Sequence, residues 1–264
     1  MDTFQPEKAI VPIVIASEHD PIQEILGTGC FIGTSNNLHI LTAKHIFELG
    51  ERDEFAKYAF LFNSGKRVEI WAISEIVASK DYDIAICKIA PIEGAIPLQF
   101  AKQQPALNAD VYCYEYSQIS IERKRGGGKH IKIEPFAHKG NIMRYIESEY
   151  PEKVKTQCFN TSFPALQGAS GAPVIAHTQN KNFYIAGIMV ANQETHLMPA
   201  QVVKIEDGES YIEETSYFLP TGKGINSSLI IQVIEELGVE IEYVDSNVSL
   251  ICKAKTFLLK LLNC

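Results

Sequence analysis

Three separated segments contain side chains of the types that cooperate in acyl transfer. His45 stands at the end of an apolar run, and Asp83 directly precedes another apolar run. Ser170 lies between Gly168 and Gly171, immediately before a third apolar run. A serine hydroxyl is a poor nucleophile until a base within hydrogen-bond reach removes its proton, and a third group can orient that base. The three residue types therefore predict a site for nucleophilic catalysis by serine.

Each segment taken alone also has an ordinary structural explanation. A histidine at a strand end can be structural, an aspartate before a strand can form a turn, and glycines around a serine can simply make a tight turn. Together the segments are more specific, because His, Asp, Ser is the chain order of one of three unrelated triad classes. The gaps between them are long enough for the groups to come from two different barrels.

The motifs around these residues read GTGCFIG at 27–33, ILTAKH at 40–45, DYDIAICKI at 81–89 and QGASGAP at 167–173. With them the sequence resembles the trypsin/chymotrypsin-like serine proteases over roughly residues 8–220. It is most similar to the compact bacterial trypsin-like peptidases and to the protease domain of Deg-type enzymes. The resemblance implies two six-stranded antiparallel β-barrels with the active site in the cleft between them, polypeptide substrates, and neither a cofactor nor a metal.

The resemblance also implies a role for each residue. His45 is the base, Asp83 holds its tautomer, and Ser170 attacks the substrate carbonyl. Asp83 is preferred to Asp81 because it directly precedes the apolar run, where the acid of the family sits. The backbone N–H groups of Gly168 and Ser170 are expected to form the oxyanion hole.

Several positions depart from the family pattern. Ala169 stands where secreted relatives have an aspartate that captures a new N-terminus, and Ile46 stands where they have a disulfide-forming cysteine. Both departures suit an intracellular enzyme. Ala172 replaces a second glycine, which raises the prospect of a restricted or inactive site.

The predicted substrate pocket has no charged residue. By the resemblance it is formed by Pro164, Met189, Val190, Ala191 and Asn192. Such a pocket favours an uncharged P1 side chain, small or aliphatic. The main prediction is therefore an intracellular serine endopeptidase. A pseudoprotease that binds peptides on the same fold is the alternative, and acyl transfer on small esters is a third.

The elements that must position these residues are predicted to be mainly strands. About a dozen short runs rich in Val, Ile, Tyr and Phe, separated by Gly, Asn, Asp, Ser and Pro, indicate an all-β fold. We expect a first barrel over 1–100 with His45 and Asp83, and a second over 101–224 with Ser170. Residues 225–264 are expected to form a C-terminal helix, closed by Gly238, and a short helical extension.

Composition limits the partners. The chain has 264 residues with 24 basic and 32 acidic side chains, a net charge of −8, which disfavours general nucleic-acid binding. No apolar run is long enough to span a bilayer, and no signal peptide is recognisable, so we expect a cytoplasmic protein without a membrane partner. The six cysteines are expected to be buried free thiols. Control of activity is expected from the glycine-rich loop 123–130, from the extension 238–264, or from a regulatory partner protein bound through that extension.

Overall fold

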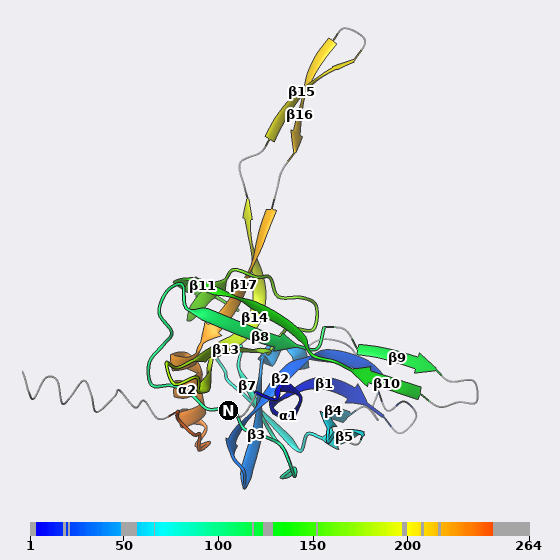
Figure 1. Ribbon diagram of the computed structural model, residues 1–264, viewed down its shortest axis with the longest axis vertical. Helices are drawn as coiled ribbons and strands as arrows, with labels where there is room; N and C mark the ends of the chain where they lie inside the picture. Colours follow the sequence, from blue (N-terminus) through cyan, green and yellow to red (C-terminus); the bar gives the residue numbers. More distant parts are fainter. Residues whose placement is uncertain are drawn as a thin grey trace, which may run out of the picture.

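The computed structural model describes residues 4–17, 20, 22–48, 57–65, 67–117, 119–123, 129–151, 153–196, 200–206, 209–215 and 218–244. Two antiparallel sheets lie side by side, with the long hairpin β14–β17 rising from one of them (Figure 1). Short helices begin the described chain (α1, Pro6–Ala9) and end it (α2, Ser227–Glu236). None of the helices in the described residues is long and apolar enough to cross a membrane.

The N-terminal sheet has seven strands in the order β5-β4-β1-β2-β3-β7-β6. Their bounds are β1 (Ile10–Ala16), β2 (Glu24–Thr34), β3 (Asn37–Thr42), β4 (Lys57–Asn63), β5 (Val68–Ala72), β6 (Glu75–Ala78) and β7 (Ala85–Lys88). The 3₁₀ helix η1 (Lys44–Phe47) follows β3. Instead of the predicted closed barrel of six strands, this half is an open sheet of seven.

The open sheet is nevertheless strongly rolled. β5 and β6 form its opposite edges, yet only Ile73 and Ser74 separate them along the chain. The Ile73 N–H donates to the carbonyl of Tyr58 on β4 (3.0 Å), and the Ser74 N–H donates to the carbonyl of Lys88 on β7 (3.0 Å). Because two residues cannot span a flat sheet, the edges must curve toward each other. The chain link closes this half-barrel where no strand ladder does among the described residues.

The C-terminal half is a closed six-stranded barrel, as predicted. Its strand order is β11-β12-β17-β14-β13-β8. The bounds are β8 (Asp110–Glu115), β11 (Phe136–Glu149), β12 (Lys155–Thr161), β13 (Pro173–His177), β14 (Phe183–His196) and β17 (Phe218–Asn226). Two further hairpins pair β9 (Ile119–Arg123) with β10 (Lys129–Ile133), and β15 (Ala200–Glu206) with β16 (Glu209–Thr215). The glycines of the loop at 123–130 lie outside the described residues.

One apolar core joins the two halves. β1 and β2 are buried along most of their length, and three phenylalanines of the N-terminal sheet (Phe31, Phe60, Phe62) pack edge to face. The same cluster includes Ile188 and Val190 of β14 in the barrel. The two halves therefore form one packed body, so groups brought from each can be held at fixed distances.

The predicted C-terminal helix is present as α2. The side chain of Asn226 accepts a hydrogen bond from the Leu229 N–H (3.0 Å), which caps the helix. Its buried residues face the common core: Leu229, Ile230, Val233 and Ile234. Gly238 lies just beyond the helix with φ +70°, as expected of the residue that ends it. The helix-like segment 253–262 of the predicted extension lies outside the described residues.

Candidate active site

His45 and Asp83 lie together because β3 and β7 are neighbouring strands. Thr42 of β3 pairs with Ala85 of β7. His45 follows the end of β3, and Asp83 precedes the start of β7. Because the strands are antiparallel, these two ends lie side by side. A single strand pairing thus positions both side chains.

The three predicted residues form a continuous hydrogen-bonded chain. His45 Nδ1 lies 2.7 Å from Asp83 Oδ2, and His45 Nε2 lies 2.8 Å from Ser170 Oγ. The His45 backbone N–H also donates to Asp83 Oδ1 (2.8 Å). An ionised carboxylate only accepts hydrogen bonds, so Nδ1 carries the proton and Nε2 is left as the acceptor for the serine hydroxyl. This is the arrangement a general base requires.

Asp83 is held in its ionised form. Its side chain is only 1% exposed, and burial by itself would raise the pKa of the carboxyl. The hydrogen bonds and charge of His45, together with a hydrogen bond from Tyr150, outweigh burial and lower the pKa below its usual value. The carboxylate can therefore stabilise a positive charge on the imidazole. Asp81, the other acid considered, is exposed.

The turn before Ser170 contains Gly168, one of the two residues predicted to form the oxyanion hole. The Ala169 N–H donates to the Leu166 carbonyl (2.9 Å), and Gly168 has φ +93°. A positive φ at the third residue of such a turn favours glycine. A Cβ at Gly168 would also lie 3.0 Å from the Tyr116 carbonyl oxygen. Within the described residues the N–H groups of Gly168 and Ser170 donate to no acceptor, so both are available to a ligand oxygen.

Thr28 of β2 holds this turn from the opposite half of the molecule. Its hydroxyl donates to the Gly168 carbonyl (2.8 Å) and accepts from the Tyr116 N–H (3.0 Å), and its own N–H donates to the Ser170 carbonyl (2.9 Å). Thr28 is fully buried. No role was predicted for Thr28 from the sequence, although a polar residue between glycines in an apolar strand was the available signal. Gly27 permits the approach, because a Cβ there would lie 2.7 Å from the Ser170 carbonyl oxygen.

The predicted pocket residues differ in exposure. Met189 and Val190 are buried, Pro164 and Ala191 are partly buried, and Asn192 is exposed. The Asn192 amide bridges to the backbone next to Pro164: its oxygen accepts from the Ala165 N–H (2.6 Å), and its nitrogen donates to the Ala165 carbonyl (2.7 Å). The two predicted walls of the pocket are therefore tied together by a side chain.

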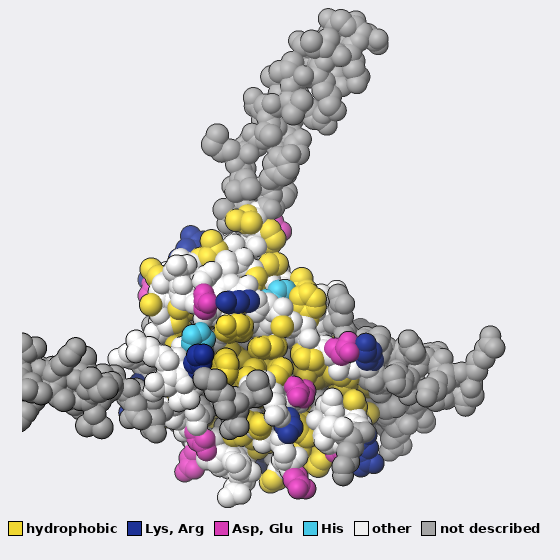
Figure 2. Space-filling model, in the orientation of Figure 1, with side chains coloured by type: hydrophobic (Ala, Val, Ile, Leu, Met, Phe, Trp, Pro, Cys, Tyr) yellow, Lys and Arg dark blue, Asp and Glu magenta, His cyan; other side chains and the backbone are white. Residues whose placement is uncertain are grey.

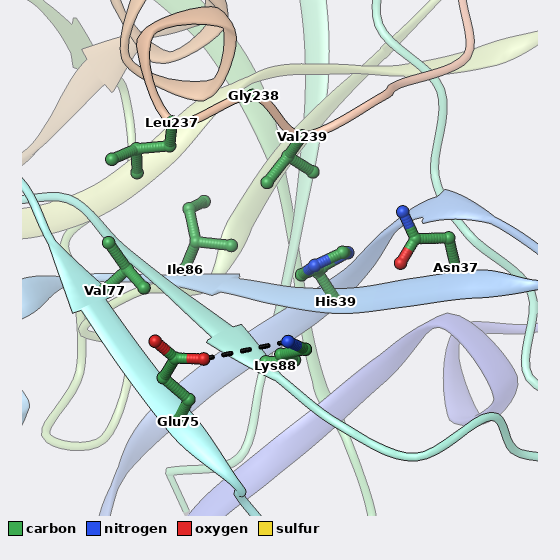
Figure 3. Close-up of a pocket in the computed structure, with 9 residues that line it drawn as sticks. All are labelled: Asn37, His39, Glu75, Val77, Ile86, Lys88, Leu237, Gly238 and Val239. Atoms are coloured by element: carbon green, nitrogen blue, oxygen red, sulfur yellow. Dashed lines mark ion pairs between the residues drawn. The ribbon is translucent and has the colours of Figure 1, made fainter.

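A separate pocket of about 340 Å³ lies between the N-terminal sheet and the segment after α2. Figure 3 shows His39, Val77, Ile86 and the Glu75–Lys88 ion pair (3.8 Å) facing Leu237 and Val239. His39 is 8% exposed, and burial lowers its pKa, so the imidazole is neutral at pH 7. This pocket contains none of the three hydrogen-bonded residues.

In the described part of the chain no group of three or more His, Cys, Asp or Glu side chains is arranged to hold a metal ion. Basic and acidic side chains are interspersed over the face seen in Figure 2, with apolar side chains between them. That face offers no continuous basic surface for phosphates.

Comparison with known families decides the class of the protein. Residues 27–182, more than half of the chain, match the trypsin-like peptidase domain. The chain belongs to the trypsin-like peptidase family. No curated protein matches it significantly by sequence.

Several solved protease structures are similar in fold to this trypsin-like peptidase. The active form of the Rv3671c protease from M. tuberculosis has a TM-score of 0.54 and 17% identity, with 90% of this chain and 84% of that chain covered. Neuropsin, a serine protease expressed in mouse brain, has a TM-score of 0.51 and 11% identity, covering 88% and 97%. The HtrA-type protease AlgW with a tripeptide has a TM-score of 0.50 and 14% identity, covering 88% and 60%. The fold is therefore chymotrypsin-like.

The family departures are accommodated in this trypsin-like peptidase by burial. Ile46, Ala169 and Ala172 are all fully buried. The Ala172 N–H donates to the Ala169 carbonyl (2.8 Å), and its carbonyl accepts from the Met189 N–H (2.9 Å). Ala172 thus lies at the junction between the turn at Ser170 and β13, where it is hydrogen-bonded to Met189 of β14.

Proposed function

We propose that this trypsin-like peptidase is a catalytically competent serine endopeptidase. The observation that supports it is the unbroken chain from Asp83 through His45 to Ser170, with distances of 2.7 and 2.8 Å. A base and nucleophile within about 2.6–3.2 Å meet the geometric requirement for proton transfer. Among the described residues the N–H groups of Gly168 and Ser170 donate to no acceptor, which supports the same proposal over a pseudoprotease.

The proposed reaction follows from this geometry. Ser170 Oγ attacks the scissile carbonyl carbon while its proton passes to His45 Nε2, and Asp83 stabilises the resulting imidazolium. The carbonyl oxygen becomes an oxyanion, which the N–H groups of Gly168 and Ser170 stabilise by roughly 3–4 kcal/mol per donor. The imidazolium then protonates the leaving amine, and the C–N bond breaks. Water, deprotonated by His45, releases the acyl group from Ser170 and restores the enzyme.

We propose an uncharged, small or aliphatic P1 residue. Pro164 and Asn192 supply no charge to the predicted pocket, and Asn192 ties its predicted walls together through Ala165. None of the five predicted pocket residues offers a carboxylate to a basic side chain. We further expect cytoplasmic action, and control by a protein partner through 238–264, of which 245–264 lie outside the described residues.

A fluorophosphonate probe tests the proposal, because it reacts with a serine only when a base and an oxyanion hole activate it. We expect labelling of the wild-type chain, and loss of labelling and of peptide cleavage in Ser170→Ala and His45→Ala, on the order of 10⁶-fold in kcat. Ser228→Ala, which alters an exposed serine at the start of α2, is the matched control. A folded wild-type chain that binds peptides but never reacts would establish the pseudoprotease instead. Turnover of small esters without peptides would favour the third alternative.

A further inference from the structure

Tyr150, at the end of β11 in the barrel, reaches the acid that the N-terminal half supplies. Its hydroxyl lies 2.9 Å from Asp83 Oδ2 and 3.3 Å from the Val190 carbonyl oxygen. A tyrosine hydroxyl has one proton to donate, and a carboxylate is the stronger acceptor. The proton therefore goes to Asp83, on the same oxygen that accepts the proton of His45 Nδ1.

The position of Tyr150 is itself fixed by its surroundings. Its N–H donates to the Val154 carbonyl (3.2 Å), and its carbonyl accepts from the hydroxyl of Thr156. The Lys223 ammonium lies 5.6 Å from the centre of its ring. Ring, backbone and hydroxyl are thus all engaged, so the hydroxyl is held in place for Asp83.

The hydroxyl remains a donor throughout the working range of pH. Burial raises the pKa of Tyr150, and the negative charge of Asp83 raises it further, so the phenol stays protonated. The other ionisable groups acting on it are Cys158 and Glu48, with Lys223 over its ring. The only ionisable group that accepts a hydrogen bond from its hydroxyl, among the described residues, is Asp83.

We propose that Tyr150 is a positioning residue of the catalytic acid, fixing the Asp83 carboxylate and sharing the charge on Oδ2 that would otherwise act on His45 alone. This rests on the proposed function, since it assigns Tyr150 a role in the same reaction. The sequence analysis did not identify it, because Tyr150 and Asp83 are 67 residues apart and come from different halves. Without the Tyr150 proton, Oδ2 would attract the imidazolium of His45 more strongly.

The test is Tyr150→Phe in the full-length chain, which keeps the ring and removes only the hydroxyl. We expect kcat to fall on the order of tenfold with KM little changed, the loss of one hydrogen bond to a charged group. We also expect the acid limb of the kcat/KM profile to move to higher pH. A packing role would lower stability but would not move this limb.

Tyr145→Phe is the matched control. Tyr145 lies on β11, the strand that Tyr150 follows, and its hydroxyl donates to the Pro105 carbonyl (2.6 Å) rather than to Asp83. It should leave the pH profile unchanged. An unaltered profile in Tyr150→Phe, or an equal shift in both variants, would overturn the proposal.

The His45 titration, followed by NMR of labelled histidine, separates this proposal from the proposed function. In Tyr150→Phe its midpoint should rise whether or not the chain cleaves peptides. A rise in an unreactive protein would sustain the role of Tyr150 and reject the endopeptidase. If the midpoint does not rise in a protein that cleaves peptides, the role of Tyr150 is rejected and the endopeptidase is sustained.

Discussion

The two halves of the molecule position the residues of the candidate site in different ways. The open N-terminal sheet supplies His45 and Asp83 from neighbouring strands, so ordinary strand pairing sets their separation. The closed barrel supplies Ser170 from a tight turn that needs positive φ at Gly168 and Gly171 and the hydrogen bonds of Thr28. The candidate base and acid therefore depend on regular structure, whereas Ser170 depends on an irregular turn braced from outside its own half.

Replacing Asp83 should have the largest effect on kcat, and it tests how the N-terminal half positions the acid. Asp83→Asn keeps the shape but favours the wrong histidine tautomer, so kcat should fall about 10⁴-fold. Asp81→Asn, at an exposed position in the same loop, is the control and should be near wild type. Steady-state cleavage of a reporter peptide measures both. If Asp81→Asn were the damaging change, the acid would be misassigned.

Asp83→Asn should also change how the free energy of unfolding depends on pH. The pKa of Asp83 is lowered in the folded state, so its ionisation stabilises the fold above the ordinary carboxyl pKa, near 3.8. That contribution is lost as the pH falls through the lowered value. Urea unfolding should therefore show Asp83→Asn less stable than wild type at pH 7, with the difference shrinking in acid. A constant difference down to the lowest pH would contradict the assignment.

Removing the hydrogen bonds that the Thr28 hydroxyl makes should have an intermediate effect. It tests how the turn at Ser170 in the barrel half is held. Thr28→Val leaves the Gly168 carbonyl and the Tyr116 N–H without their buried partner, which should lower the free energy of unfolding by about 1–3 kcal/mol. Labelling by the fluorophosphonate should slow on the order of tenfold, the size expected for a weakened oxyanion donor. The His45 titration should not move, since the pair with Asp83 is untouched.

Thr42→Val is the control for Thr28→Val. Its hydroxyl is also buried and donates to the Thr28 carbonyl (2.8 Å), but it makes no hydrogen bond to the nucleophile turn. It should lower stability without slowing the labelling at temperatures where it is folded. Equal slowing in both variants would show that general loosening, not the brace, is responsible.

The sequence predicts the parts of the site that depend on regular structure better than the contacts between the halves. The motifs identified the residues that meet at the site, the resemblance they carry implied the barrel, and the apolar periodicity predicted α2. Thr28 and Tyr150 were missed because their partners, Gly168 and Asp83, are 140 and 67 residues away. The seventh strand was missed because the edge strands β5 and β6 are short and largely unburied, which weakens the alternation of apolar residues.

Thiol reagents and reductant should have the smallest effect on the folded protein. The cysteines of the two halves should respond in the same way. Cys30 and Cys87 of the sheet and Cys113 and Cys158 of the barrel are buried and unpaired. Burial raises the pKa of each, to about 11 for Cys158, so little thiolate forms at pH 7. A thiol reagent should reach these four only after unfolding, and reductant should leave Tm unchanged. A loss of about 2 Da per pair in the unreduced protein would reveal a disulfide instead.

Thr28 and Tyr150 each make a hydrogen bond to the opposite half of the molecule. These contacts have a consequence for a chain that is still being synthesised. The N-terminal half emerges first and can fold around β3 and β7, but Tyr150 is then still to come, and so is the serine turn that Thr28 holds. A nascent or half-folded molecule would thus lack both the nucleophile and the anchor of its acid. Under the proposed function, such a molecule could not cleave peptides until the last strand of the barrel, β17, has closed the ring.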